Sequence, residues 1–537
     1  MADPAPLEIR EALESDVPAI RDIFMSVYGA DYPYRNFYDP GWLKRSVFTD
    51  DILMLVAADS DSGAVLGTAS VVFDIGAHSD LLGEFGRLAV HTDARGRGVG
   101  RHLMAARVQY VQERLHVGVV ENRCVHPYSQ RISHRHGFVP VGFLPMKHAF
   151  RRRESVALFA RHFGNGLRLR NNHPRIVPEA SDLAHVALDA CGVPFDAVVV
   201  DDGSAYPGGA DLAVESLTAE GLPSLLRIER GRVRAREVFG PMRLQYGFFK
   251  LAARHASYLL ARQRRPDGGL GPIAGAIGWI HDDIDRAVKV FELIVRDEHA
   301  VRLLFDELLR RCRADWGIAY VEVDVSAHAP RMQRTLVQLG FRPAAYIPAG
   351  VFAEVERLDV VRMVNLLVPL DLGEVKLTPQ ARVVADLVTR SFETWQVLPR
   401  IAEAVDRIGL FDDLDEEQVR RVAATCGVAE FDAGQPLFHA GDPPDRMLLP
   451  LEGEVEIQVQ GRPIGIVGAG EAVGELSLLI GAPHSATAVA RGPLVAATLS
   501  RAQLDTLTRQ RPDIGQAVFR NLACGLAAKL RRADAKL

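Results

Sequence analysis

The sequence is poor in cysteine and lacks long apolar runs. Its five cysteines lie far apart and form no C-x-x-C pair, which excludes a disulfide framework or a cysteine-rich zinc site and favours a reducing compartment. No apolar stretch approaches the roughly 18 residues of a membrane-spanning helix, and the acidic N-terminus has no hydrophobic signal core. We therefore expect a cytoplasmic protein with no membrane partner and no bound metal.

A strong excess of one charge sign is also absent. The 63 basic and 68 acidic residues give a formal net charge of −5, which excludes a chain built throughout to coat nucleic acid. The basic clusters at residues 151–153, 262–265 and 310–313 are therefore predicted to be solvated faces. With 537 residues, 48% of them hydrophobic, the chain is long enough for about three or four domains with cores of their own.

Alternating strand and helix patterns predict two α/β domains, residues 1–165 and 166–372. Six residues of the first domain recur in the second at a constant offset of 203 residues. The matching pairs are Gln130 and Gln333, Arg131 and Arg334, Gly137 and Gly340, Phe138 and Phe341, Pro140 and Pro343, and Pro145 and Pro348. Six matches at one offset indicate a duplicated domain, with chance similarity between two α/β domains as the alternative.

The rest of the chain has a different pattern. Residues 373–405 are predicted to be a helical linker. Residues 406–537 contain short strands separated by glycines, which predict an all-β barrel or jelly roll closed by an amphipathic helix from Pro512 to Leu530. No room for a DNA-recognition helix follows, so we expect no nucleic-acid partner. The predicted fold class is therefore tandem α/β domains followed by an all-β jelly roll.

The most informative stretch joins an apolar strand to a helix through three alternating glycines. The strand ends at Leu88, Ala89 and Val90, and the loop and helix start are Arg95, Gly96, Arg97, Gly98, Val99, Gly100 and Arg101. Without Cβ atoms, glycines let successive N–H groups converge on one point. The helix N-terminus adds unpaired donors and partial positive charge. The loop is therefore predicted to bind a pyrophosphate, with the three arginines around it.

This loop resembles the acetyl-CoA-binding motif of the GCN5-related N-acetyltransferase (GNAT) family. The motif, (R/Q)-x-x-G-x-(G/A), reads here Arg95-x-x-Gly98-x-Gly100, and a Gly-Phe pair follows at Gly137. The resemblance covers most of residues 7–150. It implies transfer of an acetyl group from acetyl-CoA to an amine or a protein lysine. It also implies that the backbone from Leu88 to Val90 pairs with the pantetheine and polarises the thioester oxygen.

The same resemblance suggests catalytic residues. Glu84 occupies the place of the base glutamate of histone-type members, which removes a proton from the acceptor amine. Family members commonly have an acid tyrosine four residues before the Gly-Phe glycine, where this chain has Ser133. Because the pKa of a serine hydroxyl is too high for a good general acid, the acid stays open. The choices are Ser133, Tyr128, His126, His134 or unassisted departure of the thiolate.

The second α/β domain lacks the glycine loop. Only six residues, Arg296 to Val301, lie between the strand ending at Val295 and the helix at Arg302; none of the six is glycine and two are acidic. Such a turn is not expected to bind a pyrophosphate. We therefore expect a degenerate GNAT-like domain that packs against the first one and shapes the acceptor cleft.

A second motif lies in the C-terminal segment. It consists of Gly474, Glu475, Leu476 and Ser477, followed by Pro483, His484, Ser485, Ala486 and Thr487. It resembles the phosphate cassette of cyclic nucleotide-binding domains, whose glutamate, here Glu475, accepts a hydrogen bond from the ribose 2′-hydroxyl. The family's phosphate-binding arginine is His484 here, and losing a guanidinium contact costs about 1.5–3 kcal/mol. Two alternatives follow, weak cyclic nucleotide binding or a ligand-free docking or dimerising role.

These motifs favour an acyl-CoA-dependent N-acyltransferase with a catalytic first domain, a degenerate second domain and a regulatory C-terminal domain. The alternative is a non-catalytic acyl-CoA-binding sensor or signalling protein, which the serine at the acid position favours. The acceptor amine, the acyl length and the oligomeric state, a homodimer included, stay open.

Overall fold

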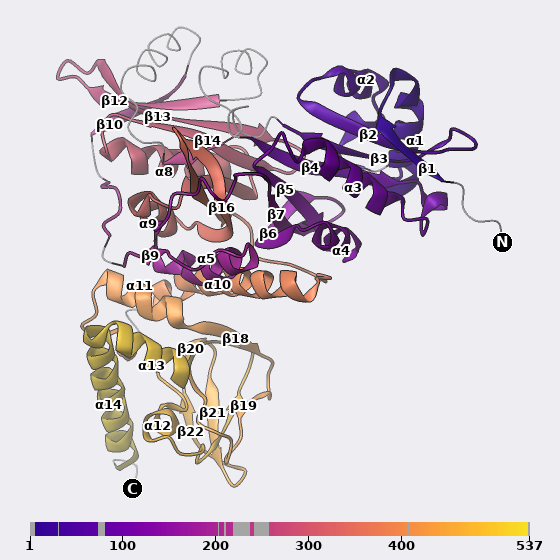
Figure 1. Cartoon of the computed structure of the whole chain (residues 1–537). Helices are drawn as coiled ribbons and strands as arrows, with labels where there is room; N and C mark the ends of the chain where they lie inside the picture. Colours follow the sequence, from indigo (N-terminus) through magenta and orange to yellow (C-terminus); the bar gives the residue numbers. More distant parts are fainter. Residues whose placement is uncertain are drawn as a thin grey trace. The chain divides into compact units, whose positions relative to one another are not determined.

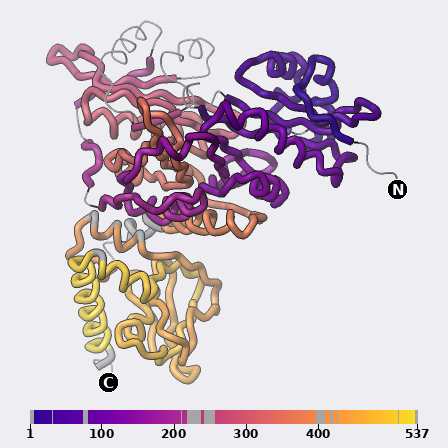
Figure 2. The backbone as a smooth tube through the Cα atoms, in the orientation of Figure 1, coloured from indigo at the N-terminus to yellow at the C-terminus, as the bar shows by residue number. Residues whose placement is uncertain are grey.

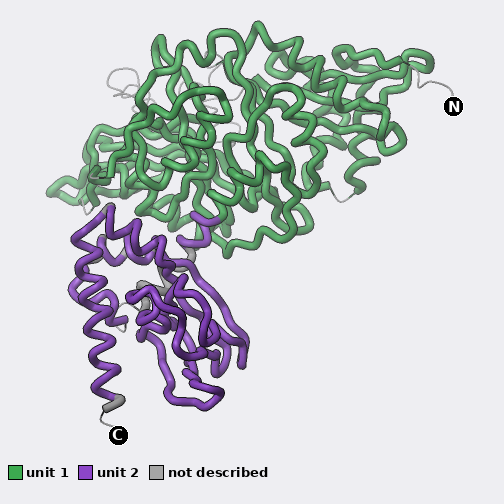
Figure 3. The backbone as a smooth tube through the Cα atoms, turned by 60° about the horizontal axis from the view of Figure 1, so that its bottom comes forward, with its two compact units in different colours: residues 1–389 green, residues 390–537 purple. Residues whose placement is uncertain are grey.

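The computed structural model of the chain describes residues 6–30, 32–73, 81–201, 203–208, 211–217, 237–240, 257–404 and 408–534. The chain forms two compact units, residues 1–389 and residues 390–537 (Figure 3). The boundary lies inside the long helix α10 (Pro379–Ala404), within the segment predicted to be a helical linker.

Unit 1 contains two α/β halves that follow one another in the chain, here called the first and the second repeat (Figure 1). The elements of the first repeat are β1 (Leu7–Glu11), η1 (Glu14–Asp16), α1 (Val17–Tyr28), η2 (Arg35–Tyr38), α2 (Pro40–Phe48), β2 (Ile52–Asp59), β3 (Val65–Val72), β4 (Leu82–Val90), η4 (Thr92–Ala94), α3 (Val99–Val111), β5 (Val117–Arg123), α4 (Tyr128–Arg135), β6 (Val139–Ala149) and β7 (Arg153–His162).

From β13 onward, the second repeat has the same succession of strands and α-helices as the first repeat has from β3 onward. The elements that follow β7 are β8 (Arg175–Ile176), α5 (Pro178–Ala190), β9 (Val198–Val199), β10 (Leu212–Ser216), β11 (Val238–Phe239), β12 (Ser257–Arg264), β13 (Leu270–Asp282), β14 (Ala287–Val295), α8 (His299–Ala314), β15 (Tyr320–Ser326), α9 (Pro330–Gln338), β16 (Arg342–Ala353) and β17 (Glu356–Leu366). The bounds of β5 and β15 differ by the predicted 203 residues at both ends.

The two repeats share one continuous sheet. Its strand order is β1-β2-β3-β4-β5-β7-β6-β16-β17-β15-β14-β13-β12-β10, so the second half mirrors the first about the pair of β6 and β16. Figure 2 follows the backbone from the indigo and purple strands of the first repeat to the pink and orange strands of the second. Because this sheet is continuous, residues 1–165 and 166–372 do not separate into two compact units.

The helix that follows each repeat is bound by the other repeat. Gln130 on α4 of the first repeat donates to the carbonyl of Lys376 (2.9 Å) and accepts from the amide of Thr378 (2.9 Å), just before α10. Gln333 on α9 of the second repeat accepts from the amide of Val177 (3.1 Å), just before α5. Both glutamines are fully buried. These crossed contacts tie the repeats together as exchanged segments tie a swapped dimer.

Helix α1 illustrates how sequence pattern becomes packing in this unit. Its apolar positions recur every three or four residues, so Val17, Ile20, Ile23 and Phe24 lie on one face and are buried. They pack with Met54 and other residues in the core beneath α1 and α2. On the other face of the sheet, α3 packs on β2, β3 and β4, and α8 packs on β12, β13 and β14 of the second repeat.

Unit 2 is a small β domain with helices at both ends. Its elements are η6 (Gly409–Phe411), α11 (Glu416–Thr425), β18 (Gly427–Phe431), β19 (Pro436–Phe438), β20 (Arg446–Glu452), β21 (Val455–Val459), β22 (Arg462–Val467), α12 (Glu475–Ile480), β23 (Thr487–Ala490), β24 (Leu494–Ser500), α13 (Arg501–Gln510) and α14 (Pro512–Asp534). Two sheets, β18-β24-β20 and β19-β23-β21-β22, enclose an apolar core. The predicted fold class, α/β units followed by a β jelly roll with a closing helix, is confirmed.

Candidate functional site

The central feature of the first repeat is a fork between the parallel strands β4 and β5. Their ladder pairs join Leu82, Gly83 and Glu84 to Val117, Gly118 and Val119. Beyond Glu84, β4 continues beside β3, whereas β5 continues beside β7. In the described part of the chain, no strand is paired with the β5-facing edge of β4 from Phe85 to Val90. An open edge of this kind can pair with an extended ligand that carries amides.

The open edge contains a β-bulge. Ser70 is paired with Gly86 and Thr68 with Ala89, so Arg87 and Leu88 stand opposite the single residue between Thr68 and Ser70. Arg87 has φ 55°, in the left-handed region. A bulge leaves an extra residue out of the ladder, and its amides become available to another acceptor. The bulge therefore lies on the length of β4 that β5 does not pair with, next to Leu88.

The glycine loop lies at the end of the same strand. Gly96 and Gly98 have φ 84° and 75°, a region that a side chain rarely tolerates, and Gly98 is the N-cap of α3. At Gly100 a Cβ atom would lie 3.4 Å from Ile132 of α4 and 3.8 Å from both Leu88 and Val90. Strand end, glycine loop and α4 therefore meet at one place. This arrangement presents the unpaired N–H groups of the first turn of α3.

The three arginines of the loop have different environments. The side chains of Arg95 and Arg101 are exposed. Arg97 instead forms an ion pair of 2.9 Å with Asp59, at the turn between β2 and β3. The hydrogen bond from Arg97 lowers the pKa of Asp59 to about 2. Arg97 thus fixes the loop to the neighbouring turn, and Arg95 and Arg101 are the cations open to an anionic ligand.

Glu84 lies at the fork itself. It is half-buried, and it points away from the buried side chain of Phe85, which packs edge-on against Phe138 at 4.9 Å between ring centroids. Its partner Val119 shares its face of the sheet, and Glu121 follows on that same face two residues along β5. The carboxylate that the sequence indicated as a base is therefore placed on the face opposite α3.

The residues considered as a general acid lie on or near α4. Ser133 is buried, and its hydroxyl donates to Oδ1 of Asn122 (3.2 Å). Tyr128 is 65% exposed and lies against His126, with 5.2 Å between ring centroids. Burial lowers the pKa of His126, and His134 is exposed. Ile132, the residue before Ser133, is the one that lies beside Gly100 of the glycine loop, and the Tyr128 side chain is largely exposed.

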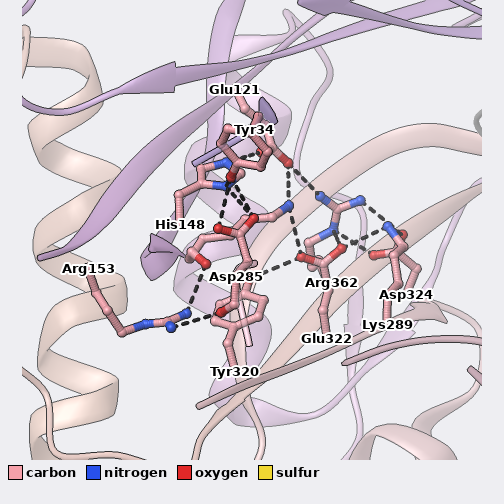
Figure 4. A network of polar contacts seen from close by, with 11 residues as sticks. Tyr34, Glu121, His148, Arg153, Asp285, Lys289, Tyr320, Glu322, Asp324 and Arg362 are labelled. Carbon is pink, nitrogen blue, oxygen red and sulfur yellow. Dashed lines mark hydrogen bonds and ion pairs between the residues drawn. The ribbon is translucent and has the colours of Figure 1, made fainter. Parts of the chain in front are cut away.

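A buried network of polar side chains lies on the Glu84 face and joins the two repeats (Figure 4). Asp285, in the turn between β13 and β14, accepts hydrogen bonds from the hydroxyl of Tyr34 (2.7 Å) and the amide of Ala149 (2.8 Å). Its carboxylate also contacts Nδ1 of His148 at 2.9 Å. Nε2 of His148 lies 3.3 Å from Glu121. Burial alone would lower the pKa of His148, but Asp285 and Glu121 raise it to about 9.

The network continues into the sheet of the second repeat. Lys147 lies 2.5 Å from Glu121 and 3.3 Å from Glu322. Glu322 also contacts Lys289 (2.8 Å), and Arg362 contacts Asp324 (2.7 Å). Despite burial, these cations hold the pKa of Glu322 well below its ordinary value. Each buried carboxylate thus has at least one cation beside it, as buried charges require.

The fork of the second repeat is filled by the chain itself. Strands β14 and β15 are paired from Ala287 to Val290, and the short strand β11 then pairs with β15 through Val238 and Phe239. A side chain on Gly240 would collide with Phe291 of β14, so β11 lies directly against both strands. Its backbone therefore takes the place that is open in the first repeat.

The position of Glu84 is also changed in the second repeat. Val119 and Glu322 are 203 residues apart, and their parallel-strand partners are Glu84 and Lys289. A lysine bound to Glu322 and Asp324 thus stands where the first repeat has its carboxylate. The residues Asp297 and Glu298 lead into α8, in place of the glycines before α3. Loop, fork and carboxylate are all altered in this copy.

In unit 2 the nucleotide-cassette residues are engaged by other residues of the chain. Gly474 has φ 85° and caps α12, which begins with Glu475. Glu475 is buried and forms a 2.6 Å ion pair with Lys529 of α14. Ser477 is also buried, and its hydroxyl donates to the carbonyl of Pro483 (3.4 Å).

His484 is buried as well. Its ring stacks on Phe438 with 3.8 Å between centroids and an angle of 13°. Burial lowers its pKa, so the ring is neutral at pH 7. Its Cε1 lies 3.0 Å from the point where a Cβ atom of Gly474 would lie. The exposed cassette residues are Leu476, Pro483 and Ser485. The imidazole thus lies directly against the turn at Gly474.

Sequence reasoning did not identify several residues of these sites. No local sequence pattern marks these residues, because their partners lie far away in the sequence. They are Tyr34, Asp285, Lys529 and strand β11, which fills the fork of the second repeat. Among the described residues, no group of three or more His, Cys, Asp or Glu side chains is arranged to hold a metal ion. No helix in those same ranges is long and apolar enough to cross a membrane.

Comparison with known families agrees with this geometry. Residues 50–140 match the model of the acetyltransferase (GNAT) domain, which spans the fork and the glycine loop. Residues 428–511 match the model of the cyclic nucleotide-binding domain. The chain therefore contains a GNAT acetyltransferase domain and a C-terminal cyclic nucleotide-binding domain.

Two curated relatives match parts of the chain. The cAMP-dependent protein kinase regulatory subunit of Yarrowia lipolytica is 34% identical over 104 residues, which are 19% of this chain and 28% of that protein. An uncharacterized NTE family protein of Mycobacterium bovis is 32% identical over 84 residues, 16% of this chain and 14% of its own length. The chain spans less than a third of either relative.

Solved structures resemble each part separately. A cyclic nucleotide-binding domain from Methylobacillus flagellatus KT is 34% identical, with a TM-score of 0.25, covering 26% of this chain and 83% of that one. The ribosomal-protein-alanine N-acetyltransferase from Brucella melitensis is 24% identical, with a TM-score of 0.26, covering 29% and 99%. The yncA protein from Salmonella typhimurium, solved with its cofactor acetyl-CoA, is 20% identical, with a TM-score of 0.27, covering 30% and 95%.

Proposed function

We propose that the protein is an acyl-CoA-dependent N-acyltransferase whose active site lies at the fork of the first repeat. The observation that carries this proposal is the joining of an open strand edge, at Leu88 to Val90, to a glycine loop that starts α3. The edge would pair with the amides of the pantetheine of acetyl-CoA, and the loop with its pyrophosphate. The exposed cations Arg95 and Arg101 would add charge around the phosphates.

In the proposed reaction Glu84 removes a proton from the acceptor amine, directly or through water, and the amine attacks the thioester carbonyl. The bulge at Arg87 and Leu88 supplies backbone N–H groups for the carbonyl oxygen as negative charge develops on it. Ser133 is not assigned as the acid, because it already donates its proton to Asn122. The thiolate would then leave unassisted or through water.

The acceptor would reach the fork from the Glu84 face, which the second repeat borders through Asp285 and Glu322. We assign the acceptor to the class of primary amines, of a small molecule or of a protein lysine. The second repeat would bind no acetyl-CoA, since β11 occupies its fork and Lys289 replaces the carboxylate. It would instead form one wall of the acceptor site.

The test is direct binding and turnover with the full chain. We expect isothermal titration calorimetry to give one acetyl-CoA per chain, and Gly98→Glu to abolish binding, because a carboxylate would enter the pyrophosphate site in a left-handed backbone. The Glu84→Gln variant should bind acetyl-CoA normally and lose most of its kcat at neutral pH. Equal binding by wild type and Gly98→Glu would refute the site. An unchanged pH–rate profile for Glu84→Gln would remove Glu84 from the base role.

A second candidate function is a sensor that binds acyl-CoA without transferring the acyl group. The buried and engaged hydroxyl of Ser133 favours it. The two functions are separated by incubating the protein with acetyl-CoA and a library of amines or a cell lysate. Acetylated products seen by mass spectrometry would reject the sensor. Tight acetyl-CoA binding without any such product would favour it.

We further propose that unit 2 is a regulatory domain with weak or no affinity for cyclic nucleotides. The supporting contacts are the ion pair of Glu475 with Lys529 and the stacking of His484 on Phe438. A nucleotide would have to displace the first contact and find no guanidinium at the second. A docking or dimerising role of the domain is compatible with these contacts.

A further inference from the structure

One buried charge in the first repeat has no carboxylate beside it. Arg107 lies on α3 with 1% of its surface exposed. No carboxylate among the described residues forms an ion pair with its guanidinium. Its Nε atom has no hydrogen-bond partner there either. Burial lowers its pKa to about 9, which still leaves it charged at neutral pH.

The cost of this arrangement makes a purely structural role a poor explanation. An apolar side chain would fill the same core position without desolvating a charge. The neighbours of Arg107 on the buried face of α3, Leu103, Met104, Val108 and Val111, are all apolar. The guanidinium is therefore expected to serve the groups to which it donates hydrogen bonds, and not only to fill the core.

Arg107 donates to two backbone carbonyls beside the bulge, one on β3 and one on β4, and its Nη2 also donates to Sδ of Met104 (3.0 Å). Its Nη1 donates to the carbonyl of Ser70 and to the carbonyl of Gly86, each at 3.1 Å. Ser70 and Gly86 are the last ladder pair before the bulge. The guanidinium also lies over the ring of Phe85, 5.4 Å from its centroid. One side chain thus holds both strands where the bulge begins.

Besides holding the two strands together, Arg107 has an electronic effect on the bulge. The carbonyl of Gly86 and the N–H of Arg87 belong to the same peptide unit, and Arg87 is the bulged residue with φ 55°. A charged donor on that carbonyl polarises the peptide and strengthens its N–H as a donor. The polarised N–H lies in the bulge that borders the fork. Arg107 therefore acts on the fork without being exposed to it.

We propose that Arg107 is a positioning residue for acyl transfer, which fixes the β4 bulge and strengthens its N–H donors toward the thioester oxygen. This inference rests on the proposed acyltransferase function. The buried interior of α3 would then contribute to turnover, whereas the N-terminus of α3 would contribute to acetyl-CoA binding. Because the pyrophosphate loop begins at Arg95, twelve residues before Arg107, the two roles can be separated by experiment.

The experiment measures kcat, KM and acetyl-CoA affinity for wild type, Arg107→Met and Arg107→Lys. Methionine fills the space without charge or donors. We expect Arg107→Met to lower kcat about tenfold, because it loses polarisation of the donor while the donor itself remains. KM and the dissociation constant for acetyl-CoA should change less than about threefold. Arg107→Lys keeps the charge and one donor, and it should recover part of the lost kcat.

Val111→Ala is the matched control, since Val111 is fully buried on the same face of α3, four residues beyond Arg107. It should lower stability with little change in kcat. If Arg107→Met fails to fold, the kcat of Arg107→Lys is compared with that of wild type instead, and a lower kcat supports the inference. A kcat within twofold of wild type in the folded Arg107 variants would overturn the inference. A wild type that neither binds nor uses acetyl-CoA would instead refute the proposed function.

Discussion

Gly142 of β6 and Ala345 of β16 face each other as ladder partners, and they are 203 residues apart. The offset is the one that relates the two repeats, so equivalent positions meet at the centre of the sheet. An antiparallel pair of equivalent residues is the mark of a local two-fold axis. Unit 1 is therefore organised as a two-fold dimer whose subunits are joined in one chain.

The first prediction concerns this contact. A Cβ atom on Gly142 would collide with the side chain of Ala345 and would lie 2.8 Å from the carbonyl oxygen of Ala344 and the Cα atom of Ala345. Gly142→Ala should therefore reduce the free energy of unfolding by about 1–3 kcal/mol. Urea unfolding of the full chain measures the change. The exchange variant Gly142→Ala with Ala345→Gly removes the methyl–methyl collision but not the close approach to the β16 backbone, so it should recover only part of the loss. Additive effects of the two substitutions would contradict a contact between equivalent positions.

The second prediction concerns the buried network between the repeats. Lys147→Met removes the cation that lies between Glu121 and Glu322. Two buried carboxylates would be left short of a partner, and the free energy of unfolding should fall by about 3 kcal/mol or more. The control is Lys44→Met, which breaks the exposed pair with Glu14 and should cost less than about 1 kcal/mol. Equal losses would show that the network adds little to the joining of the repeats.

The third prediction follows from His148 in the same network. Its pKa is raised to about 9 in the fold and is near 6.5 in the unfolded chain. The protonated form is therefore favoured by folding. Its contribution is complete below about pH 6.5 and disappears as the pH rises through 9. The charged groups around it, Asp285, Glu121 and Lys147, have pKa values displaced away from this window.

We expect the free energy of unfolding to fall by about 2–3 kcal/mol between pH 6 and pH 9.5, as measured by urea unfolding at each pH. His148→Gln should be less stable than wild type at pH 6 and should lose most of this slope. The same slope in His148→Gln and wild type would assign the pH dependence to other groups.

The features that sequence could predict are those encoded locally. The glycine loop depends on Gly96, Gly98 and Gly100, which alternate along the chain, and Gly96 and Gly98 need no distant partner to adopt a left-handed backbone. The cassette around Glu475 is local in the same way. The repeat was visible because residues such as Gln130 and Gln333 keep both their spacing and their role, each binding the segment that precedes the other repeat's terminal helix.

The features that sequence could not predict depend on pairing across long separations. Strand β11 is short and has no pattern that marks it as the segment that fills the second fork. Arg107 reads as one more polar residue on a helix, although the fold buries it. Lys529 is a half-exposed residue of a terminal helix, and only the folded domain brings it to Glu475. The sequence shows the charge and hydrogen-bonding groups of each residue, but only the topology of the fold determines its partner.

The last prediction concerns the cyclic nucleotide-binding domain. Wild type should show no shift in melting temperature with cyclic AMP or cyclic GMP, because Glu475 is bound to Lys529 and His484 is neutral and stacked on Phe438. In His484→Arg combined with Lys529→Met, a guanidinium is restored and Glu475 is released. Each restored contact to a charged group is worth about 1.5–3 kcal/mol, so the gain in affinity should be at least ten- to hundredfold.

The measurement is a thermal-shift titration of the full chain, followed by calorimetry of any variant that responds. Lys529→Met alone is the informative control, since it frees Glu475 while His484 stays in place. It should bind more weakly than the double variant. If the double variant shows no shift in melting temperature with either nucleotide, more than these two side chains must block the pocket. Micromolar binding by wild type would contradict the assignment of His484 and Lys529 as the groups that block it.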